Sequence, residues 1–298
     1  MKVFVTGGTG FTGSHVVPLL LKNGYEVRCL YRPNSDRSFS LRGQPTIDIE
    51  WTLGDVSDPR ALSASMQGTD ALVNITSLGF GHADSILGAA KGAGIQRAIF
   101  VSTTAIFTQL NARSKNVRVA AETAIESSRL KYTILRPTMI YGSPRDRNMW
   151  RLIRFMRYSP MVPIFGDGNY LQQPIHVGDV AQAILSCLCN DRTIGKSYNI
   201  AGKVPLTYNQ VIDTIARQMA EPKRVWKTHI PSSPVVSLLE FFERLHIPLP
   251  IKAEQVLRLN ENKDFSYQEA QRDFGFSPLS FEEGIKLELN SVKQSVVE

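Results

Sequence analysis

The sequence predicts an α/β protein whose core is a doubly wound parallel sheet. Short apolar runs of strand length alternate with helix-length segments through the first half of the chain, which is the pattern of strand–helix–strand units. These runs are mainly apolar, as expected for strands covered by helices on both faces. A glycine-rich turn, Gly7–Gly13, joins the first strand to a helix. After Pro137 the alternation becomes irregular, which indicates a second, smaller lobe.

Six apolar runs supply the predicted strands of the sheet. All are short, and most are rich in the β-branched and aromatic residues that fit a buried strand. The helical segments between them bring each strand back to the same direction. The runs are Val3–Val5, Glu26–Tyr31, Ile49–Leu53, Ala71–Ile75, Ala98–Ser102 and Tyr132–Arg136.

The segments between these strands carry helix signals. Pro18 lies inside the first of them, Gly10–Asn23, and predicts a local kink because proline lacks an N–H and crowds the preceding turn. Gly24 and Gly94 follow two of the helices and favour termination there. The other helices predicted in this half are Pro59–Met66, Ala83–Ala93 and Val117–Ser128.

Beyond Pro137 the sequence predicts a basic amphipathic helix, Asn148–Tyr158, and then a Pro/Gly-rich loop, Ser159–Pro174. Asp179 is expected to cap the helix that ends at Leu188, because a short side-chain oxygen satisfies free N–H groups of a first turn. Thr207 is expected to cap Tyr208–Met219 for the same reason. The remaining predicted elements are the strands Ile175–Val177 and Ser197–Ile200 and the helices Val235–Leu245 and Ala253–Leu259.

Composition indicates a globular chain with a large core, since 43% of its 298 residues are hydrophobic. No apolar run is long enough for a transmembrane helix, and Met1 opens a strand rather than a signal segment, so a cytoplasmic location is expected. The three cysteines lack metal-ligand spacing and are expected to be buried thiols in a reducing compartment, with no metal site. The apolar face of Val235–Leu245 is expected to pack on the lobe, with a membrane-surface or dimer contact as the alternative.

The net charge of +7 is concentrated in one region, since eleven arginines and lysines lie between Arg113 and Arg157. They are dispersed and carry no nucleic-acid reader motif, so no nucleic-acid partner is expected. An anionic cofactor or substrate explains the excess better. The competing explanation is a solvated helix face with scattered surface charges, which would account for more than half of them.

The glycine-rich turn predicts a diphosphate site. Gly7 allows a tight turn, Gly10 lets a ligand approach the backbone, and Gly13 lets the helix pack closely on the strand. A strand that turns into a helix in this way directs backbone N–H groups and the positive helix end at one point. That point suits the diphosphate of a dinucleotide.

Eight short motifs follow one another along essentially the whole chain. They are Thr6–Gly13, Gly54–Val56, Ala89–Gly94, Val101–Thr104, Leu135–Gly142, Phe165–Gly168, Ile175–Ala181 and Gly275–Pro278. Together they resemble the extended and atypical short-chain dehydrogenase/reductase family, which holds NAD(P)-dependent sugar-nucleotide epimerases and dehydratases. The segment Gln172–His176 is more similar to the atypical branch that includes complex I-associated subunits.

The resemblance implies a Rossmann-type domain of residues 1–158 plus 175–204, and a C-terminal substrate lobe of residues 159–174 plus 205–298. In the family Asp55 and Val56 contact the adenine, and a turn or helix-cap role for Asp55 is compatible with that contact. The resemblance places cofactor contacts at Gly7, Thr9, Gly10, Phe11, Thr12, Gly13, Arg32, Asp55, Val56, Thr76, Pro137 and Thr138.

The end of the second strand predicts NADP(H) as the cofactor, with NAD as the alternative. NAD-selective members carry an acid here that accepts from the ribose hydroxyls, whereas this chain has Arg32 and no carboxylate before Asp36. A guanidinium can stack on adenine and bind a 2′-phosphate through two parallel hydrogen bonds. Ser35 and Arg37 can add donors, and the competing interpretation is that Arg32 is only a surface cation.

The family removes or delivers a proton through a tyrosine and a lysine four residues later, with a serine or threonine polarising the substrate oxygen. Thr104, with Thr103 beside it, fills the serine/threonine place. No tyrosine fills the other place, because none occurs between Tyr31 and Tyr132. The usual base is therefore missing.

Two helix registers remain for the tyrosine–lysine pair. The preferred register puts Arg118 at the lysine place and Ser114 at the tyrosine place, and the other uses Lys115 with Asn111. A serine hydroxyl is too weakly acidic to replace tyrosine, and arginine keeps its proton. If Lys115 is desolvated beside the nicotinamide, its lowered pKa would let it act as the acid or base.

The substrate side also departs from the family. Sugar-nucleotide members often carry an arginine where this chain has Gln172, so Arg145, Arg147 or Arg151 would have to supply the charge, unless the substrate is not a sugar nucleotide. The resemblance thus implies an NAD(P)-dependent oxidoreductase or epimerase acting on a small anionic or sugar-like substrate. The alternative is a non-catalytic NAD(P)-binding sensor, chaperone or assembly subunit. Family members often form homodimers through a helix pair, here Ala83–Ala93 and Val117–Ser128, and the sequence leaves this open.

Overall fold

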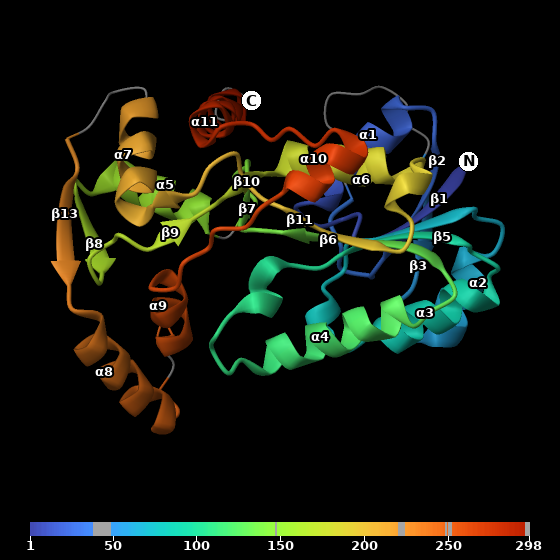
Figure 1. The fold of residues 1–298 in the computed structure, drawn as a ribbon, viewed down its shortest axis with the longest axis horizontal. Coiled ribbons are helices and arrows are strands. Elements are labelled where there is room, and N and C mark those ends of the chain that lie inside the picture. The colour runs from blue at the N-terminus through green and yellow to red at the C-terminus, as the bar shows by residue number, and fades with distance from the viewer. Residues whose placement is uncertain (38–48, 147, 220–223, 248, 250–251, 296–298) are drawn as a thin grey trace.

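The computed structural model describes residues 1–37, 49–146, 148–219, 224–247, 249 and 252–295. Its centre is a seven-stranded sheet in which every described pairing is parallel (Figure 1). The order reverses on the two sides of β1, which is the topology of a doubly wound sheet, so the predicted fold class is confirmed. In spatial order the strands are β11 (Lys196–Ile200), β6 (Lys131–Pro137), β5 (Arg97–Val101), β4 (Ala71–Asn74), β1 (Lys2–Thr6), β2 (Glu26–Tyr31) and β3 (Ile49–Leu53).

Helices cover both faces of this sheet (Figure 1). Along β1, Val3 and Val5 belong to the core under one layer and Phe4 to the core under the other, because successive side chains of a strand point to opposite faces. The first layer is α1 (Gly13–Lys22), α6 (Val177–Leu188) and α10 (Gln268–Phe274). The second is α2 (Pro59–Met66), α3 (Ala83–Gly92) and α4 (Arg113–Glu126).

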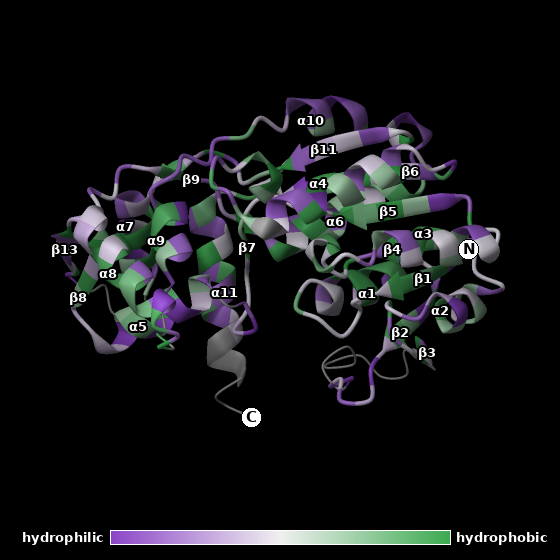
Figure 2. Cartoon of the chain, turned by 90° about the horizontal axis from the view of Figure 1, so that it is seen from below, coloured by the Kyte–Doolittle hydropathy of each residue, from purple (hydrophilic) through white to green (hydrophobic). Residues whose placement is uncertain are grey.

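A third core lies in the C-terminal lobe, which Figure 2 shows at the end of the molecule away from β3. It joins Ile153 of α5 (Met149–Tyr158), Ile212 of α7 (Tyr208–Gln218) and Ile285 of α11 (Phe281–Ser295). The sequence-based domain boundaries remain a prediction. The other elements here are β7 (Ile140–Tyr141), β8 (Met161–Phe165), β9 (Leu171–Gln172), β10 (Ile175–His176), β12 (Leu206–Thr207), β13 (Trp226–Ile230), α8 (Ser232–Arg244) and α9 (Ala253–Leu259).

The predicted loop Ser159–Pro174 is wrong, because it contains β8 and β9. β8 pairs in parallel with β13 and contains Pro163, one of the residues that made the segment Pro/Gly-rich. Proline is tolerated at a sheet edge, where its missing N–H breaks no ladder. Among the described residues, β13 is the one strand that pairs with β8. β8 is therefore an edge strand, and Pro163 lies at a sheet edge.

The two predicted helix caps have different outcomes. Thr207 caps α7 and forms a reciprocal capping box with Gln210, as a threonine followed three residues later by a glutamine allows. Asp179 does not cap α6, because the helix begins two residues earlier, at Val177. His176 is the cap instead, and its Nδ1 accepts from the Gly178 N–H at 3.2 Å.

Two surface features differ from expectation. Cys189 is exposed, with its Sγ 2.9 Å from the Tyr25 hydroxyl, although Cys29 and Cys187 are buried as predicted. Helix α8 packs on α9 but buries none of its own residues, and its Phe241 is 56% exposed. Within the described part of the chain, no helix is both long and apolar enough to cross a membrane.

Candidate functional site

The glycine-rich turn forms a cradle at the carboxyl end of β1. Gly7 has a φ of +73°, which favours glycine, and its carbonyl oxygen accepts from the Gly10 N–H at 3.0 Å. A Cβ on Gly13 would lie 2.3 Å from the Gly7 oxygen and 2.5 Å from the Gly8 oxygen. Only glycine therefore allows α1 to start so close to the turn.

The start of α1 suits an anionic group. Thr12 stands at the N-cap position with helical backbone angles and makes no side-chain cap hydrogen bond. The N–H groups of an uncapped first turn carry the positive end of the helix dipole. The cradle thus fits the diphosphate that the sequence predicts, and the residues that would hold it are Gly7, Thr9, Gly10, Phe11, Thr12 and Gly13.

Hydrogen bonds fix the strand ends beside this cradle. Thr6 donates from Oγ1 to Oδ1 of Asn74 at 2.7 Å, and Asn74 donates from Nδ2 to the Thr76 carbonyl at 3.0 Å. A Cβ on Gly7 would lie 3.0 Å from the Thr76 nitrogen. The predicted cofactor residue Thr76 therefore lies directly against the turn, because β1 and β4 are neighbours that end at the same edge.

Asp55 lies in the connection between β3 and α2, and its contact with the adenine stays a prediction. Its carboxylate accepts from the Ser57 side chain at 2.7 Å and backbone at 2.9 Å, and these bonds lower its pKa, with a smaller effect from the charge of Arg32. Asp55 therefore forms a turn, and the cap of α2 belongs to Asp58. Val56 is buried beside it.

Three predicted 2′-phosphate donors follow β2. Arg32 is exposed, and its N–H donates to Ser35 Oγ at 3.2 Å. The Arg37 guanidinium lies 4.5 Å from the centre of the Tyr31 ring, a cation–π contact that holds it near the end of the strand. Two cations and a hydroxyl thus gather where an NAD-selective member has an acid.

Thr103 and Thr104 follow β5. Thr103 accepts from the Ala105 N–H at 3.2 Å and caps the short helix η3 (Thr104–Phe107). Thr104 is buried, and its hydroxyl donates to the Pro137 carbonyl at 3.4 Å. Thr138 is also buried, and its hydroxyl donates to the Gln173 carbonyl, so the carboxyl ends of β5 and β6 meet here.

Helix α4 directs one cation toward the loop after η3 and another toward the connection after β4. Lys115 donates from Nζ to the Thr108 carbonyl at 2.6 Å. Arg118 lies against Gly79 of η2 (Leu78–Phe80), since a Cβ there would be 3.0 Å from its Nε. Burial lowers the pKa of Arg118, and the charge of Arg258 lowers it further. The helix therefore offers cations where the family has a tyrosine–lysine pair.

A buried ion pair, which the sequence did not reveal, fixes α4 on the sheet. Glu122 accepts from Arg136 Nη2 at 2.6 Å and Nε at 2.9 Å, and Ser102 donates to its other oxygen. Glu122 is 4% exposed. Such a two-donor contact is directional, so it sets the rotation of α4 about its axis. In the sequence, the one sign of this ion pair is that Glu122 stands four residues, or about one helical turn, after Arg118.

The C-terminal lobe holds a buried cation, Lys263, that sequence analysis missed. Gln172 is buried and accepts from Lys263 Nζ at 3.2 Å. Lys263 also donates to the Glu261 carbonyl at 3.3 Å, and burial lowers the pKa of its ammonium to about 8. A positive charge therefore lies beside Gln172, on a residue 91 positions away, which no local spacing could indicate.

The segment Asn260–Phe265 crosses from the lobe to the loop after η3. The Glu261 carboxylate accepts from the Thr108 hydroxyl at 2.7 Å and from the Gln109 N–H at 2.6 Å. The rings of Phe107 and Phe265 lie 5.7 Å apart. These contacts tie the loop that carries Thr104 to the C-terminal lobe.

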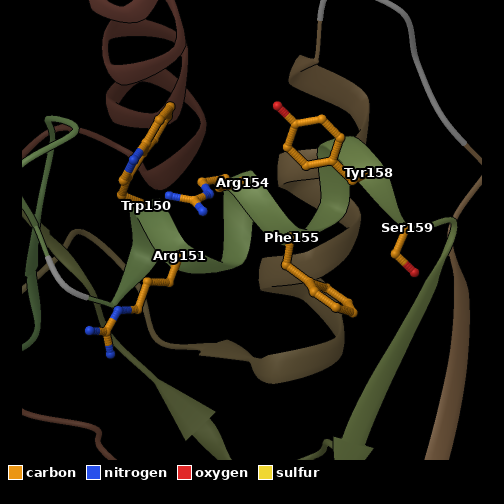
Figure 3. Close-up of a pocket in the computed structure, with 6 residues that line it drawn as sticks. All are labelled: Trp150, Arg151, Arg154, Phe155, Tyr158 and Ser159. Carbon is orange, nitrogen blue, oxygen red and sulfur yellow. The ribbon is translucent and has the colours of Figure 1, made fainter. Parts of the chain in front are cut away.

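The arginines expected to bind substrate lie in different places. Arg145 donates from Nη2 to the Thr9 carbonyl of the cradle at 3.4 Å. Arg147 lies outside the described residues. Arg151 lines a shallow pocket on the outer surface of α5 (Figure 3). The other residues of that pocket are Trp150, Arg154, Phe155, Tyr158 and Ser159.

A family model described as NAD(P)H-binding matches residues 7–191, which include the cradle, Thr103 and Thr104, and α4. The chain belongs to the NAD(P)H-binding family. Solved structures with the same fold include two sugar-nucleotide epimerases. The UDP-glucose 4-epimerase of Thermotoga maritima has a TM-score of 0.77 at 20% identity, with 99% of this chain and 100% of that one covered. The UDP-glucuronic acid 4-epimerase of Bacillus cereus, solved with NAD, has a TM-score of 0.76 at 19% identity, with the same coverage.

Two curated relatives of this NAD(P)H-binding protein are similar in sequence. The mitochondrial NADH dehydrogenase (ubiquinone) 1 alpha subcomplex subunit 9 of Arabidopsis thaliana is 27% identical, with 86% of this chain and 67% of the relative covered. Ceramide reductase of Caulobacter vibrioides is 29% identical, with 65% of this chain and 62% of the relative covered. The chain thus spans about two thirds of the length of these relatives, and a cytoplasmic location stays a prediction.

Proposed function

We propose that the chain is an NADP(H)-dependent oxidoreductase of the epimerase/dehydratase type that acts on a small polar, anionic substrate. The observation that carries the proposal is the juxtaposition of the diphosphate cradle with polar and cationic groups at the ends of the adjoining strands. Thr104 follows β5, Lys115 reaches the loop after η3, and Arg118 reaches η2, which follows β4. Ligands of doubly wound sheets bind at these carboxyl ends.

The proposed chemistry needs a proton as well as a hydride. The cofactor, when bound, supplies or accepts the hydride. Serine is too weak an acid and arginine retains its proton, so neither Ser114 nor Arg118 replaces the tyrosine. Lys115 occupies the lysine place in the alternative register of α4, and we assign the proton transfer to its amino group. The Thr104 hydroxyl, whose one proton points to the Pro137 carbonyl in this structure, would turn that proton to the substrate oxygen and polarise it.

Replacing Lys115 by alanine is expected to lower turnover at least about 100-fold, the usual size of a general acid–base contribution, while NADPH still binds. The measurement is stopped-flow oxidation of NADPH over a panel of aldehydes, oxo acids and nucleotide sugars. Lys91→Ala, an exposed lysine on α3, is the matched control and should retain wild-type turnover. Unchanged turnover in the Lys115 variant would eliminate the assignment.

A second candidate, a non-catalytic NADP(H)-binding subunit, is favoured by the contacts of Asn260–Phe265. Glu261 and Phe265 hold the loop after η3 against the lobe, so the residues that follow Thr104 are engaged in packing against the lobe. The same panel separates the two functions. If the wild-type chain binds NADPH tightly and oxidises it with none of these substrates, and Glu261→Gln does not change that result, the subunit function is supported.

Replacing Arg32 by alanine is expected to weaken NADP⁺ binding about 10- to 100-fold and to leave NAD⁺ binding within about twofold, because a charge-assisted contact with the 2′-phosphate is lost. Isothermal titration with each coenzyme measures the two affinities. Arg129→Ala is the control, since Arg129 is exposed in the α4–β6 connection at the opposite edge of the sheet. A wild-type chain that binds NAD⁺ more tightly than NADP⁺ would refute the preference.

A further inference from the structure

Arg145 lies outside the family's glycine motif, yet it reaches the cradle. It belongs to the loop between β7 and α5, more than 130 residues from the turn that it contacts, and its Nη2 donates to the Thr9 carbonyl at 3.4 Å. Thr9 stands between Gly7 and Gly10. The guanidinium is therefore at the rim of the site in which the diphosphate binds.

A second observation places the same charge beside the first turn of α1. Burial is the main reason that the pKa of His15 is lowered, and the charge of Arg145 lowers it further. His15 is the third residue of α1. Arg145 thus lies near both parts of the cradle, the turn and the helix start, rather than near one exposed carbonyl alone.

The loop that presents Arg145 is anchored on both sides. The Arg145 N–H donates to Ser143 Oγ at 3.2 Å, and the Asp146 N–H donates to the Ser143 carbonyl at 3.0 Å. Asp146 is 5% exposed, and its Oδ1 accepts from the Asn148 and Trp150 N–H groups at 3.0 Å. A cation carried on such a loop loses little conformational freedom when it meets an anion.

We propose that Arg145 is a cationic clamp for the cofactor diphosphate, acting from the lobe side of the cradle. A guanidinium has five donors in a fixed planar arrangement, so it can hold a carbonyl and a phosphate oxygen together. The glycine-rich turn supplies partial charges from backbone N–H groups, whereas Arg145 adds a full positive charge. This role differs from the substrate contact predicted from sequence.

The test uses the fact that NAD⁺ and NADP⁺ share the diphosphate. Arg145→Ala is expected to weaken both coenzymes by the same factor, about tenfold at low ionic strength, and Arg145→Lys is expected to weaken them less. Arg32→Ala, in contrast, should change only NADP⁺ affinity. Isothermal titration of the four proteins, wild type included, gives the affinities, and the apo melting temperatures check folding. If Arg145→Ala misfolds, Arg145→Gln replaces it.

Two results would overturn the clamp. Unchanged affinity for both coenzymes would remove Arg145 from the cofactor site. A loss confined to NADP⁺ would assign it to the 2′-phosphate. An equal loss that shrinks in high salt supports the proposal, because salt screens a charge–charge contact at an exposed site.

Discussion

Replacing Gly13 by alanine is expected to abolish measurable cofactor binding and to lower the free energy of unfolding by about 1 to 3 kcal/mol, the usual cost of overpacking. The new methyl group would lie 2.3 Å from the Gly7 oxygen and 2.5 Å from the Gly8 oxygen. Both are backbone atoms and cannot rotate away, so α1 must move off the turn. NADPH fluorescence titration and chemical unfolding measure the two effects.

Gly88→Ala is the matched control for this prediction. Gly88 is a glycine inside α3, and a Cβ there would meet no atom of the described residues within 4 Å. Alanine is the better helix former, so this variant should be about 0.5 to 1 kcal/mol more stable than the wild type. Its NADPH affinity should be unchanged. A Gly13 variant that binds NADPH like the Gly88 variant would show that the cradle does not hold the diphosphate.

The dinucleotide half of the molecule could be predicted because its signals are local. Gly7, Gly10 and Gly13 lie within one turn, and the strands predicted in this half are short, mainly apolar runs. The pleat alternates side chains between two helix layers, so runs with apolar residues at successive positions already imply burial on both faces. The predicted strands and helices of this half all occur, with ends shifted by a few residues.

The lobe could not be predicted in the same way, because its key contacts join distant segments. Paired residues of β8 and β13 are 65 positions apart in the sequence. β8 also contains Pro163, and proline is disfavoured in strands. Lys263 reaches Gln172, and Glu261 reaches Thr108, over 91 and 153 residues. Such pairs are determined by the path of the whole chain, which one sequence without relatives does not reveal.

A buried glutamate in the C-terminal lobe, Glu288, leads to the second prediction with a large effect, which concerns the pH dependence of stability. Glu288 of α11 is fully buried, and neither of its carboxylate oxygens accepts a hydrogen bond from a donor group of the described residues. Burial raises its pKa to about 9, and the Asp146 carboxylate raises it further through its charge and through the side-chain hydrogen bond that a protonated Glu288 makes with it. Asp146 uses one oxygen to hold the start of α5. An ionised Glu288 would therefore place a second negative charge in an apolar site.

Glu288→Gln is expected to make stability less dependent on pH. The pKa of Glu288 in the folded protein lies above the ordinary value of 4.5. The folded protein therefore binds this proton more tightly than the unfolded chain does, and the free energy of unfolding falls as the pH rises from 4.5 toward about 9. One such proton corresponds to about 1.4 kcal/mol per pH unit. Between pH 6 and 8 the wild type should therefore lose about 2 to 3 kcal/mol relative to the variant.

Chemical unfolding of both proteins at several pH values measures this difference. Glu283→Gln on the same helix is the control, because Glu283 is exposed and its pKa is lowered by hydrogen bonds from Ser280. The stability that ionised Glu283 contributes is fully present at any pH above the ordinary glutamate pKa. Removing this carboxylate should therefore not change how the free energy of unfolding varies between pH 6 and 8. If the Glu288 variant follows the wild-type slope instead, Glu288 is already ionised in the fold, and a cation or an altered packing must then neutralise it beside Asp146.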